Sequence, residues 1–195
     1  MGKGRLEAFS DGVIAILITI LVLELKVPHG TALADLAPLL PVFLSYVLSF
    51  AYLAIYWNNH HHMLHTVQRV SGSILWANVH LLFWLSLIPF ATAWMGENHF
   101  APVPTALYGA VLFLAAIAYT VLQLRIIASQ GRESLLHAAV GGDWKGKISP
   151  VLYLTGIAVA FVSAAASFAL YSAVALIWII PDRRIERALG SHDPR

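Results

Sequence analysis

The sequence predicts an all-α membrane protein that crosses the bilayer with six helices. Three observations predict this fold class: 59% of the 195 residues are hydrophobic, only 11% are charged, and the mean hydropathy is +0.74. An average soluble domain carries about 25% charged residues. Strand-like alternation of polar and apolar residues is absent, which disfavours an outer-membrane barrel. At about 20 apolar residues per spanning helix, we treat residues 1–195 as a single transmembrane domain.

Stretches without Asp, Glu, Lys or Arg define the helices in order. After a first helix over residues 6–27, such stretches cover residues 36–68, 70–96, 98–124 and 148–181. The last stretch would measure about 50 Å as one helix, whereas the hydrocarbon core is about 30 Å thick. We therefore divide it into a hairpin at the small residues of positions 163–167. The predicted helices cover residues 6–27, 36–62, 73–96, 101–126, 148–164 and 167–181.

The basic residues predict the orientation of these helices. With six crossings, eleven of the twelve Lys and Arg residues share one side of the membrane, and Lys26 stands alone on the other. The eleven are Lys3, Arg5, Arg69, Arg125, Arg132, Lys145, Lys147, Arg183, Arg184, Arg187 and Arg195. Since cytoplasmic loops carry the excess of positive charge, both termini are expected in the cytoplasm. A five-helix count would move the last four arginines outside and weaken this asymmetry.

Several functional classes are disfavoured at once. A net charge of +2 on so few charged residues gives no sign of nucleic-acid binding, and the absence of cysteine excludes disulfides, thiolate metal sites and thiol nucleophiles. No nucleophile and base pair stands out, so an enzyme is not expected, and neither is a cofactor. The competing interpretation of the first segment is a signal peptide cleaved near residues 32–34, but Glu7 and Asp11 are unusual in a leader.

The first helix carries an acidic group at membrane depth. Only 12 uncharged residues separate Asp11 from Glu24, about 18 Å of helix, so the helix cannot cross lipid without burying an acid. Glu7 and Asp11 could simply favour the positive amino-terminal end of the helix. For Asp11, one turn deeper, a functional or packing role toward the bundle interior is the stronger interpretation.

Other polar groups are expected at the same depth. If the second helix ends near residue 62 and the third begins near residue 73, one cytoplasmic-side layer contains Arg5, Ser10, Asp11, Asn59, His60 and His80. A carboxylate there can accept hydrogen bonds from hydroxyl, imidazole or guanidinium groups. The indole of Trp57 offers a further donor. We therefore predict a network that braces the first helix against the second and third.

The histidines of residues 60–65 also permit a metal interpretation. His61 and His65 lie four residues apart, on one face of a helix. The spacing alone is weak, because no carboxylate follows it as in a metalloprotease motif, so no metal site is predicted. Imidazole titrates near neutral pH, but nothing in the sequence develops this into a sensor.

The first helix also resembles a known motif. Arg5, Phe9, Ser10 and Asp11 match the R-x-x-x-F-S-D signature of the transmembrane protein 175 family, the lysosomal potassium channels and their prokaryotic relatives. Residues 57–60 are similar to the family's W-x-N-H segment, residues 87–90 to its I-P-F segment, and residues 176–181 to its aromatic-rich last helix. A single copy of the signature with six helices resembles the prokaryotic members.

The resemblance implies a homotetrameric cation channel in the prokaryotic inner membrane. In that family the first helix of each subunit lines a central pore, and a hydrophobic constriction lies five residues after the motif aspartate, which here is Ile16. Thr19 falls where prokaryotic members carry a hydroxyl layer, and Leu23 would form a second apolar collar. The expected partners are other copies of the chain, the lipid bilayer, and K⁺ with other monovalent cations.

The residues alone are compatible with this function without establishing it. The chain contains neither a T-V-G-Y-G filter nor an arginine ladder, so selectivity must come from helix side chains, and Thr19 is the only hydroxyl between Asp11 and Glu24. Because every face of this segment is apolar, its pattern cannot say which face lines a pore. Ile16, Thr19 and Leu23 could equally face lipid or pack against helices.

Two functions remain open at this stage. The first is a potassium-permeable channel, with Glu24 either attracting cations at the outer mouth or pairing with Lys26. The alternative is a proton-coupled secondary transporter that uses Asp11, His60 and His80 as a relay. Residues 131–147 form the only sizeable polar loop, and the sequence does not decide its structure.

Overall fold

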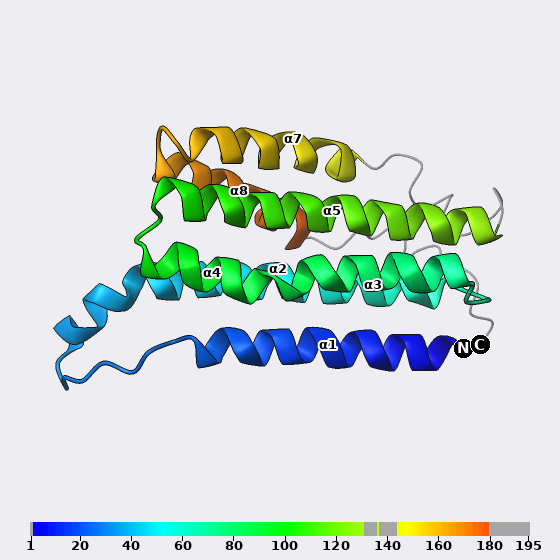
Figure 1. Cartoon of the computed structure of the whole chain (residues 1–195), viewed down its shortest axis with the longest axis horizontal. Helices are drawn as coiled ribbons and strands as arrows, with labels where there is room; N and C mark the ends of the chain where they lie inside the picture. The colour runs from blue at the N-terminus through cyan, green and yellow to red at the C-terminus, as the bar shows by residue number, and fades with distance from the viewer. Residues whose placement is uncertain (1, 131–135, 137–143, 180–195) are drawn as a thin grey trace.

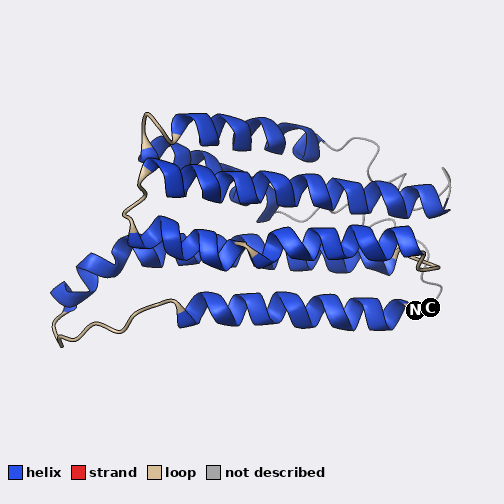
Figure 2. Cartoon of the chain, viewed as in Figure 1, coloured by secondary structure: helices blue, strands red, loops and turns tan. Residues whose placement is uncertain are grey.

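The computed structural model describes residues 2–130, 136 and 144–179, and these residues contain helices and no strand (Figures 1 and 2). The elements in order are α1 (Lys3–Leu23), the 3₁₀-helix η1 (Leu33–Leu39), α2 (Leu40–His65), α3 (Gly72–Ser86), α4 (Ile88–Glu97), α5 (Pro102–Gln130), α7 (Trp144–Val159) and α8 (Ala164–Ile179). Four helical segments are long and apolar enough to cross a membrane: Lys3–Leu23, Leu33–His65, Gly72–Glu97 and Pro102–Gln130. The all-α, multi-pass prediction is therefore confirmed.

The six predicted segments each correspond to helix in the structure, with shifted ends. The first helix stops at Leu23 rather than residue 27, and an exposed segment with Pro28 and Gly30 leads to η1. The proline and glycine interrupt helical hydrogen bonding there. The hairpin expected at positions 163–167 turns slightly earlier, between the end of α7 at Val159 and the start of α8 at Ala164.

The third predicted helix is broken in its middle. We expected one helix over residues 73–96, but α3 ends at Ser86 and α4 begins at Ile88. Pro89 explains the break, because its ring nitrogen cannot donate to the carbonyl four residues earlier. The Leu87 amide instead donates to the Trp84 carbonyl at 3.2 Å. Helical hydrogen bonding resumes with the Ala91 amide, which donates to the Leu87 carbonyl at 3.0 Å.

A cluster of tyrosines and glycines holds the centre of the bundle. The rings of Tyr52, Tyr108 and Tyr171 are among the largest fully buried side chains. Tyr171 of α8 lies against Gly109 of α5 and Gly156 of α7, where any β-carbon would collide with its ring or hydroxyl. Small residues permit this close approach of helices.

The helix α1 lies at one edge of the bundle (Figure 1). It packs on α2, α3 and α4, whereas α7 and α8 pack on α5 and on each other at the opposite edge. The starts of α1, α3 and α7 and the ends of α2 and α5 share one end of the molecule. Six basic residues belong to that end, namely Lys3, Arg5, Arg69, Arg125, Lys145 and Lys147, and the five at positions 132 and 183–195 lie outside the described residues.

Candidate pore-lining helix and its bracing contacts

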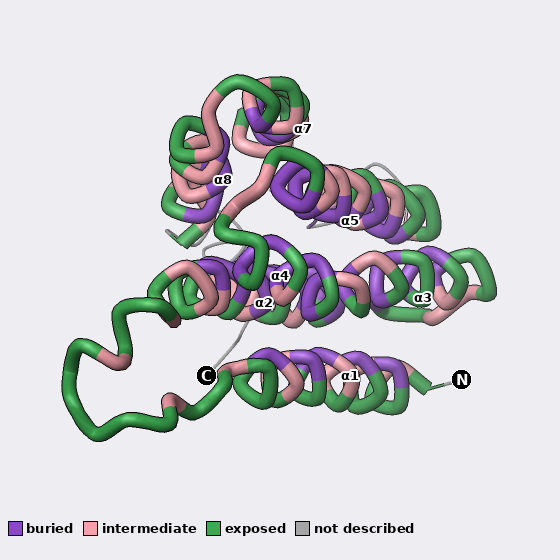
Figure 3. Tube along the Cα trace, turned by 60° about the vertical axis from the view of Figure 1, so that its left-hand side comes forward, coloured by how far each residue is buried: buried purple, intermediate pink, exposed green. Residues whose placement is uncertain are grey.

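The two faces of α1 have opposite surroundings. Leu6, Ser10, Ile14, Leu17 and Leu21 are buried against the neighbouring helices. The opposite side is exposed in the single chain, and Figure 3 shows it turned away from the bundle. It carries six exposed residues spaced alternately four and three apart, which we call the uncovered stripe: Arg5, Phe9, Gly12, Ile16, Thr19 and Leu23. Residues with this spacing lie along one side of a helix.

The three predicted pore residues all belong to the uncovered stripe. The Ile16 side chain is 59% exposed and that of Leu23 is 79% exposed, although both are large and apolar. At 1.5 Å per residue, they lie about 10 Å apart along the helix, with Thr19 between them. The packing of the helices therefore shows which face of α1 is buried and which is exposed, a distinction that the uniformly apolar sequence does not make.

The hydroxyl of Thr19 is oriented by its own helix. Its Oγ1 donates to the Ile16 carbonyl oxygen at 2.7 Å. A hydroxyl has one donor and two acceptor lone pairs. Because the hydrogen is directed to the backbone, the lone pairs remain for a group on the exposed side, and the group that suits them is a donor or a cation.

A buried chain of hydrogen bonds, the bracing chain, joins α1 to α3 and α2. His60 Nε2 donates to Asn78 Oδ1 at 2.7 Å, Asn78 Nδ2 donates to Ser10 Oγ at 3.0 Å, and Ser10 Oγ donates to the Leu6 carbonyl at 2.9 Å. His60 is 1% exposed, and Ser10 and Asn78 are fully buried. Each donor thus has an acceptor, as a low-dielectric interior requires.

Asp11 is held separately from the bracing chain. Its Oδ1 accepts a hydrogen bond of 3.0 Å from Nε1 of Trp57 on α2. A charge-assisted bond to a carboxylate is stronger than a neutral one. Asp11 and Ser10, adjacent in the signature, therefore fasten α1 to α2 and α3 through two different side chains.

Four of the residues predicted for the signature and the bracing network lie elsewhere. Asn59 donates to the Ile55 carbonyl on its own helix, and Nε2 of the exposed His80 accepts from Trp84 Nε1 on α3. Arg5 and Phe9 are exposed on the uncovered stripe, and the Arg5 side chain has no hydrogen bond or ion pair among the described residues. The structure thus brings together Ser10, Asp11, Trp57 and His60, but not the other four.

Sequence reasoning missed Asn78, the central member of the bracing chain. It lies in the stretch of residues 70–96, which is free of charged side chains, so a carboxamide there was a detectable signal. Amide groups inside membrane bundles usually hydrogen-bond across helices. His80, two residues further on, is exposed, whereas Asn78 is fully buried.

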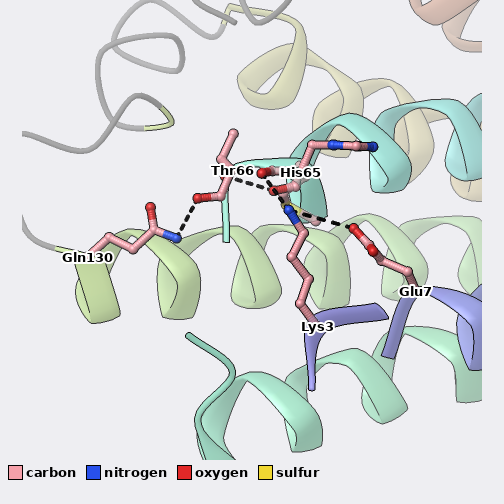
Figure 4. Close-up of polar contacts among 6 residues, drawn as sticks. Lys3, Glu7, His65, Thr66 and Gln130 are labelled. Atoms are coloured by element: carbon pink, nitrogen blue, oxygen red, sulfur yellow. Dashed lines mark hydrogen bonds and ion pairs between the residues drawn. The ribbon is translucent and has the colours of Figure 1, made fainter. Parts of the chain in front are cut away.

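The amino-terminal turn of α1 also contacts the end of α2 (Figure 4). Lys3 Nζ donates to the His65 carbonyl at 2.7 Å, and Gln130 Nε2 from α5 donates to the Thr66 carbonyl at 2.8 Å. These carbonyls belong to the last residue of α2 and to its C-cap, where carbonyls lack partners within the helix. Lys3 Nζ also lies 3.8 Å from Glu7 Oε1, so Glu7 lies near the contacts at this end of the molecule.

The histidine cluster continues along α2 beside this contact. The rings of His61 and His65 lie 4.4 Å apart between centroids, and His61 stacks on Trp57 at 6.1 Å. In the described part of the chain, no group of three or more His, Asp or Glu side chains is arranged to hold a metal ion. The cluster there consists of aromatic contacts.

At the opposite end, Lys26 forms an ion pair with Glu97 at the end of α4, rather than with Glu24. The hydrogen bond to Glu97 raises the pKa of Lys26 above its ordinary value. Because Glu24 is exposed at the end of α1, its charge is available to the solution beside Leu23.

Comparisons with known proteins agree on one family. The family model described as "Endosomal/lysosomal potassium channel TMEM175" matches residues 5–89, which include α1 from Arg5 onward and the bracing chain. A potassium channel of Chryseobacterium sp. (strain P1-3) is 57% identical over 97% of this chain and 98% of its own length. A potassium channel of Chamaesiphon minutus is 32% identical over 82% of this chain and 85% of its own. The crystal structure of a lysosomal potassium-selective channel TMEM175 homolog from Chamaesiphon minutus superposes with a TM-score of 0.81 at 30% identity, covering 92% of this chain and 97% of that one.

Proposed function

The chain belongs to the TMEM175 family, a family of ion channels rather than enzymes, and from this premise we propose that it forms a potassium-permeable channel in a prokaryotic cell membrane. Two relatives that match most of its length are named potassium channels. The observation that carries the proposal is the uncovered stripe of α1. Beyond Arg5 this stripe is apolar with one hydroxyl, and on a helix at the edge of the protomer it suits a helix that meets its copies around an axis.

The assembly we propose is a homotetramer with α1 of each protomer at the centre. Six crossings would put both termini on one side of the membrane, and the six basic residues at the end of the molecule where α1 begins favour the cytoplasmic side. The axis would cover the uncovered stripe, whereas the buried face of α1 already packs on its own protomer.

Ile16 and Leu23 would form two apolar collars in this assembly. Rings of large apolar side chains gate a pore by emptying it of water, which removes the hydration that a cation needs. Thr19 lies between them, and its lone pairs would give a partly dehydrated K⁺ a ring of oxygens. Glu24 would add negative potential at the outer mouth and raise the local concentration of cations.

Reconstitution of the purified protein in potassium-loaded liposomes tests the constriction. Ile16→Asn should raise the potassium leak severalfold, because a polar collar no longer dewets. The matched control is Val22→Asn, since Val22 is also exposed but lies about 120° around the helix from Ile16. No potassium flux in the parent protein, together with equal leaks in the two variants, would refute the proposal.

The alternative of a proton-coupled transporter finds less support in the contacts. Asp11 bonds Trp57, His60 bonds Asn78, and His80 bonds Trp84, so the three proposed relay residues lie in three separate hydrogen bonds. A transporter would show saturable, pH-coupled uptake that Asp11→Asn abolishes without dissociating the oligomer. A channel instead gives current steps that are linear in driving force near reversal.

A further inference from the structure

A guanidinium group lies on the face of α1 that carries the predicted pore residues. Arg5 begins the uncovered stripe, and its side chain forms no hydrogen bond or ion pair among the described residues. With about 100° of rotation and 1.5 Å of rise per residue, Arg5 and Ile16 differ by only about 20° around the helix and lie about 16 Å apart along it. Arg5 is therefore almost in line with the proposed constriction, at the end of the molecule where α1 begins.

The acidic residues of α1 do not offset this charge on the same face. Glu7 lies about 160° away from Arg5 around the helix, and its Oε1 is 3.8 Å from Lys3 Nζ. Asp11 lies about 120° away and accepts a hydrogen bond from Trp57. The remaining residues of the uncovered stripe carry no charge: Phe9, Gly12, Ile16, Thr19 and Leu23.

The other end of α1 carries the opposite charge. Glu24 directly follows the last residue of the uncovered stripe and is exposed, and its side chain forms no hydrogen bond or ion pair among the described residues. Lys26, two residues further on, pairs with Glu97 instead. Helix side chains point back toward the amino terminus, so Arg5 extends away from Ile16. The guanidinium group therefore lies toward the mouth of the proposed pore and not within its constriction.

Charges at the mouths of a pore act on the local concentration of ions. Low-dielectric walls focus the field of such charges, which enriches ions of opposite sign and depletes ions of like sign. Four Arg5 side chains around an axis would deplete K⁺ at the cytoplasmic mouth, whereas Glu24 would enrich K⁺ at the outer mouth. When K⁺ is dilute, its entry into the pore limits the current, so entry from the two sides becomes unequal.

We propose that Arg5 makes the channel an inward rectifier at low ionic strength, so that K⁺ enters the cell more readily than it leaves. This inference rests on the proposed function, because it requires α1 to line a shared pore. Arg5 controls the direction of the flux in this scheme, and the apolar collars control whether the pore conducts.

Single-channel recording in symmetrical KCl tests the proposal on the full-length protein. Membrane patches excised from cells that express the chain have a known cytoplasmic face. At about 10 mM KCl the Debye length is about 30 Å, longer than the distance from Arg5 to Ile16, and the inward conductance should exceed the outward conductance at least twofold. At about 1 M KCl the Debye length is about 3 Å, and the two conductances should become nearly equal. A ratio that does not change with the KCl concentration would overturn the proposal.

Variants assign the effect to one side chain. Arg5→Gln should raise the outward conductance in dilute KCl and bring the ratio close to one, whereas Arg5→Lys keeps the charge and should preserve rectification. Arg69→Gln is the matched control, because Arg69 is an exposed cation at the same end of the molecule but lies between α2 and α3. Its ratio should match that of the parent protein. Equal changes in Arg5→Gln and Arg69→Gln would trace rectification to general surface charge and overturn the role of Arg5.

Restoring the charge by chemistry covers the case in which Arg5→Gln does not fold. The chain has no cysteine, so Arg5→Cys carries a unique thiol. A cationic methanethiosulfonate reagent, applied to the cytoplasmic face of a conducting Arg5→Cys channel in dilute KCl, should lower the outward conductance at least twofold. An anionic reagent of the same class should raise it. Unchanged conductance with both reagents, with labelling confirmed by mass spectrometry, would overturn the proposal.

The recordings separate failure of this inference from failure of the proposed function. If the parent protein carries no potassium current at any KCl concentration, the channel itself is refuted. Potassium current with equal inward and outward conductances in dilute KCl would leave the channel in place and refute the role of Arg5.

Discussion

At the scale of single residues, the position of one hydrogen determines what each polar group of α1 can do. Thr19 directs its hydrogen to the Ile16 carbonyl and keeps its lone pairs outward. Ser10 also donates to a carbonyl of its own helix, that of Leu6, but it is buried and its oxygen accepts from Asn78. One hydroxyl of α1 is thus suited to an ion and the other to bracing.

Replacing Thr19 tests this assignment. Thr19→Val removes the oxygen and should lower the single-channel potassium conductance severalfold, whereas Thr19→Ser keeps the oxygen and should preserve it. Because the lost hydrogen bond is to the helix's own backbone, the thermal unfolding temperature should move little. Equal conductance in Thr19→Val and the parent protein would show that the hydroxyl does not contact the ion.

Replacing Asn78 tests whether the bracing chain stabilises the fold. Asn78→Leu leaves the Nε2–H of His60 without its acceptor and Ser10 without its donor, at a cost of about 1–3 kcal/mol for each buried group left unpaired. We expect a lower thermal unfolding temperature in detergent. Ser86→Ala is the control, since the Ser86 hydroxyl is exposed and bonds its own helix. An unchanged transition in Asn78→Leu would mean that the bracing chain contributes nothing.

At the scale of elements, close approach of helices depends on glycines that face one tyrosine. Tyr171 of α8 occupies the space that side chains at Gly109 and Gly156 would need. The hydroxyl of Tyr171 also donates to the Thr105 carbonyl at 3.3 Å, and its own carbonyl accepts from Tyr52 at 2.6 Å. The α5, α7 and α8 helices are therefore joined at one ring.

Adding a methyl group at Gly109 should disrupt this junction. Gly109→Ala forces Tyr171 or a helix to move, and overpacking of this kind costs about 1–3 kcal/mol. Gly72→Ala is the matched control, because its β-carbon would meet nothing within 4 Å. Guanidinium or thermal unfolding in detergent should show a loss for Gly109→Ala alone, and equal stabilities would contradict the packing described.

The elements also show what sequence could and could not predict. Hydropathy located all six segments, because the absence of charge along a span is a local property. Pro89 indicates a break near Leu87, but hydropathy does not predict it because residues 70–96 form one stretch without charged side chains. The facing of α1 and the partner of Ser10 are tertiary properties: Ile14 and Ile16 are equally apolar, and only packing makes one buried and the other 59% exposed.

At the scale of the whole molecule, the uncovered stripe of α1 is exposed on the surface of the protomer. At the edge of the bundle, α1 can face either lipid or other copies of the chain. These two arrangements differ in how far apart the Ile16 side chains of different protomers lie. In a tetramer with α1 at the centre they converge on the axis. Facing lipid, they are far apart.

The absence of cysteine makes this difference measurable. Ile16→Cys would place four thiols around the axis, and thiolates bind soft metal ions such as Cd²⁺. We expect Cd²⁺ to block potassium flux through Ile16→Cys and to leave Val22→Cys unaffected, with reversal by a chelator. Block of neither variant, with flux intact, would place α1 away from the ion route.

The attachments of α1 are distributed unevenly along its length. Every side-chain hydrogen bond from α1 to another helix comes from Lys3, Ser10 or Asp11, in its first half, whereas beyond Asp11 the described helix touches its neighbours only through apolar side chains such as Leu17 and Leu21. Hydrogen bonds are directional, and apolar contacts tolerate sliding. The helix is in effect a lever with its pivot near Asp11. In the proposed tetramer, an outward tilt of this lever would widen the ring at Leu23 more than the ring at Ile16.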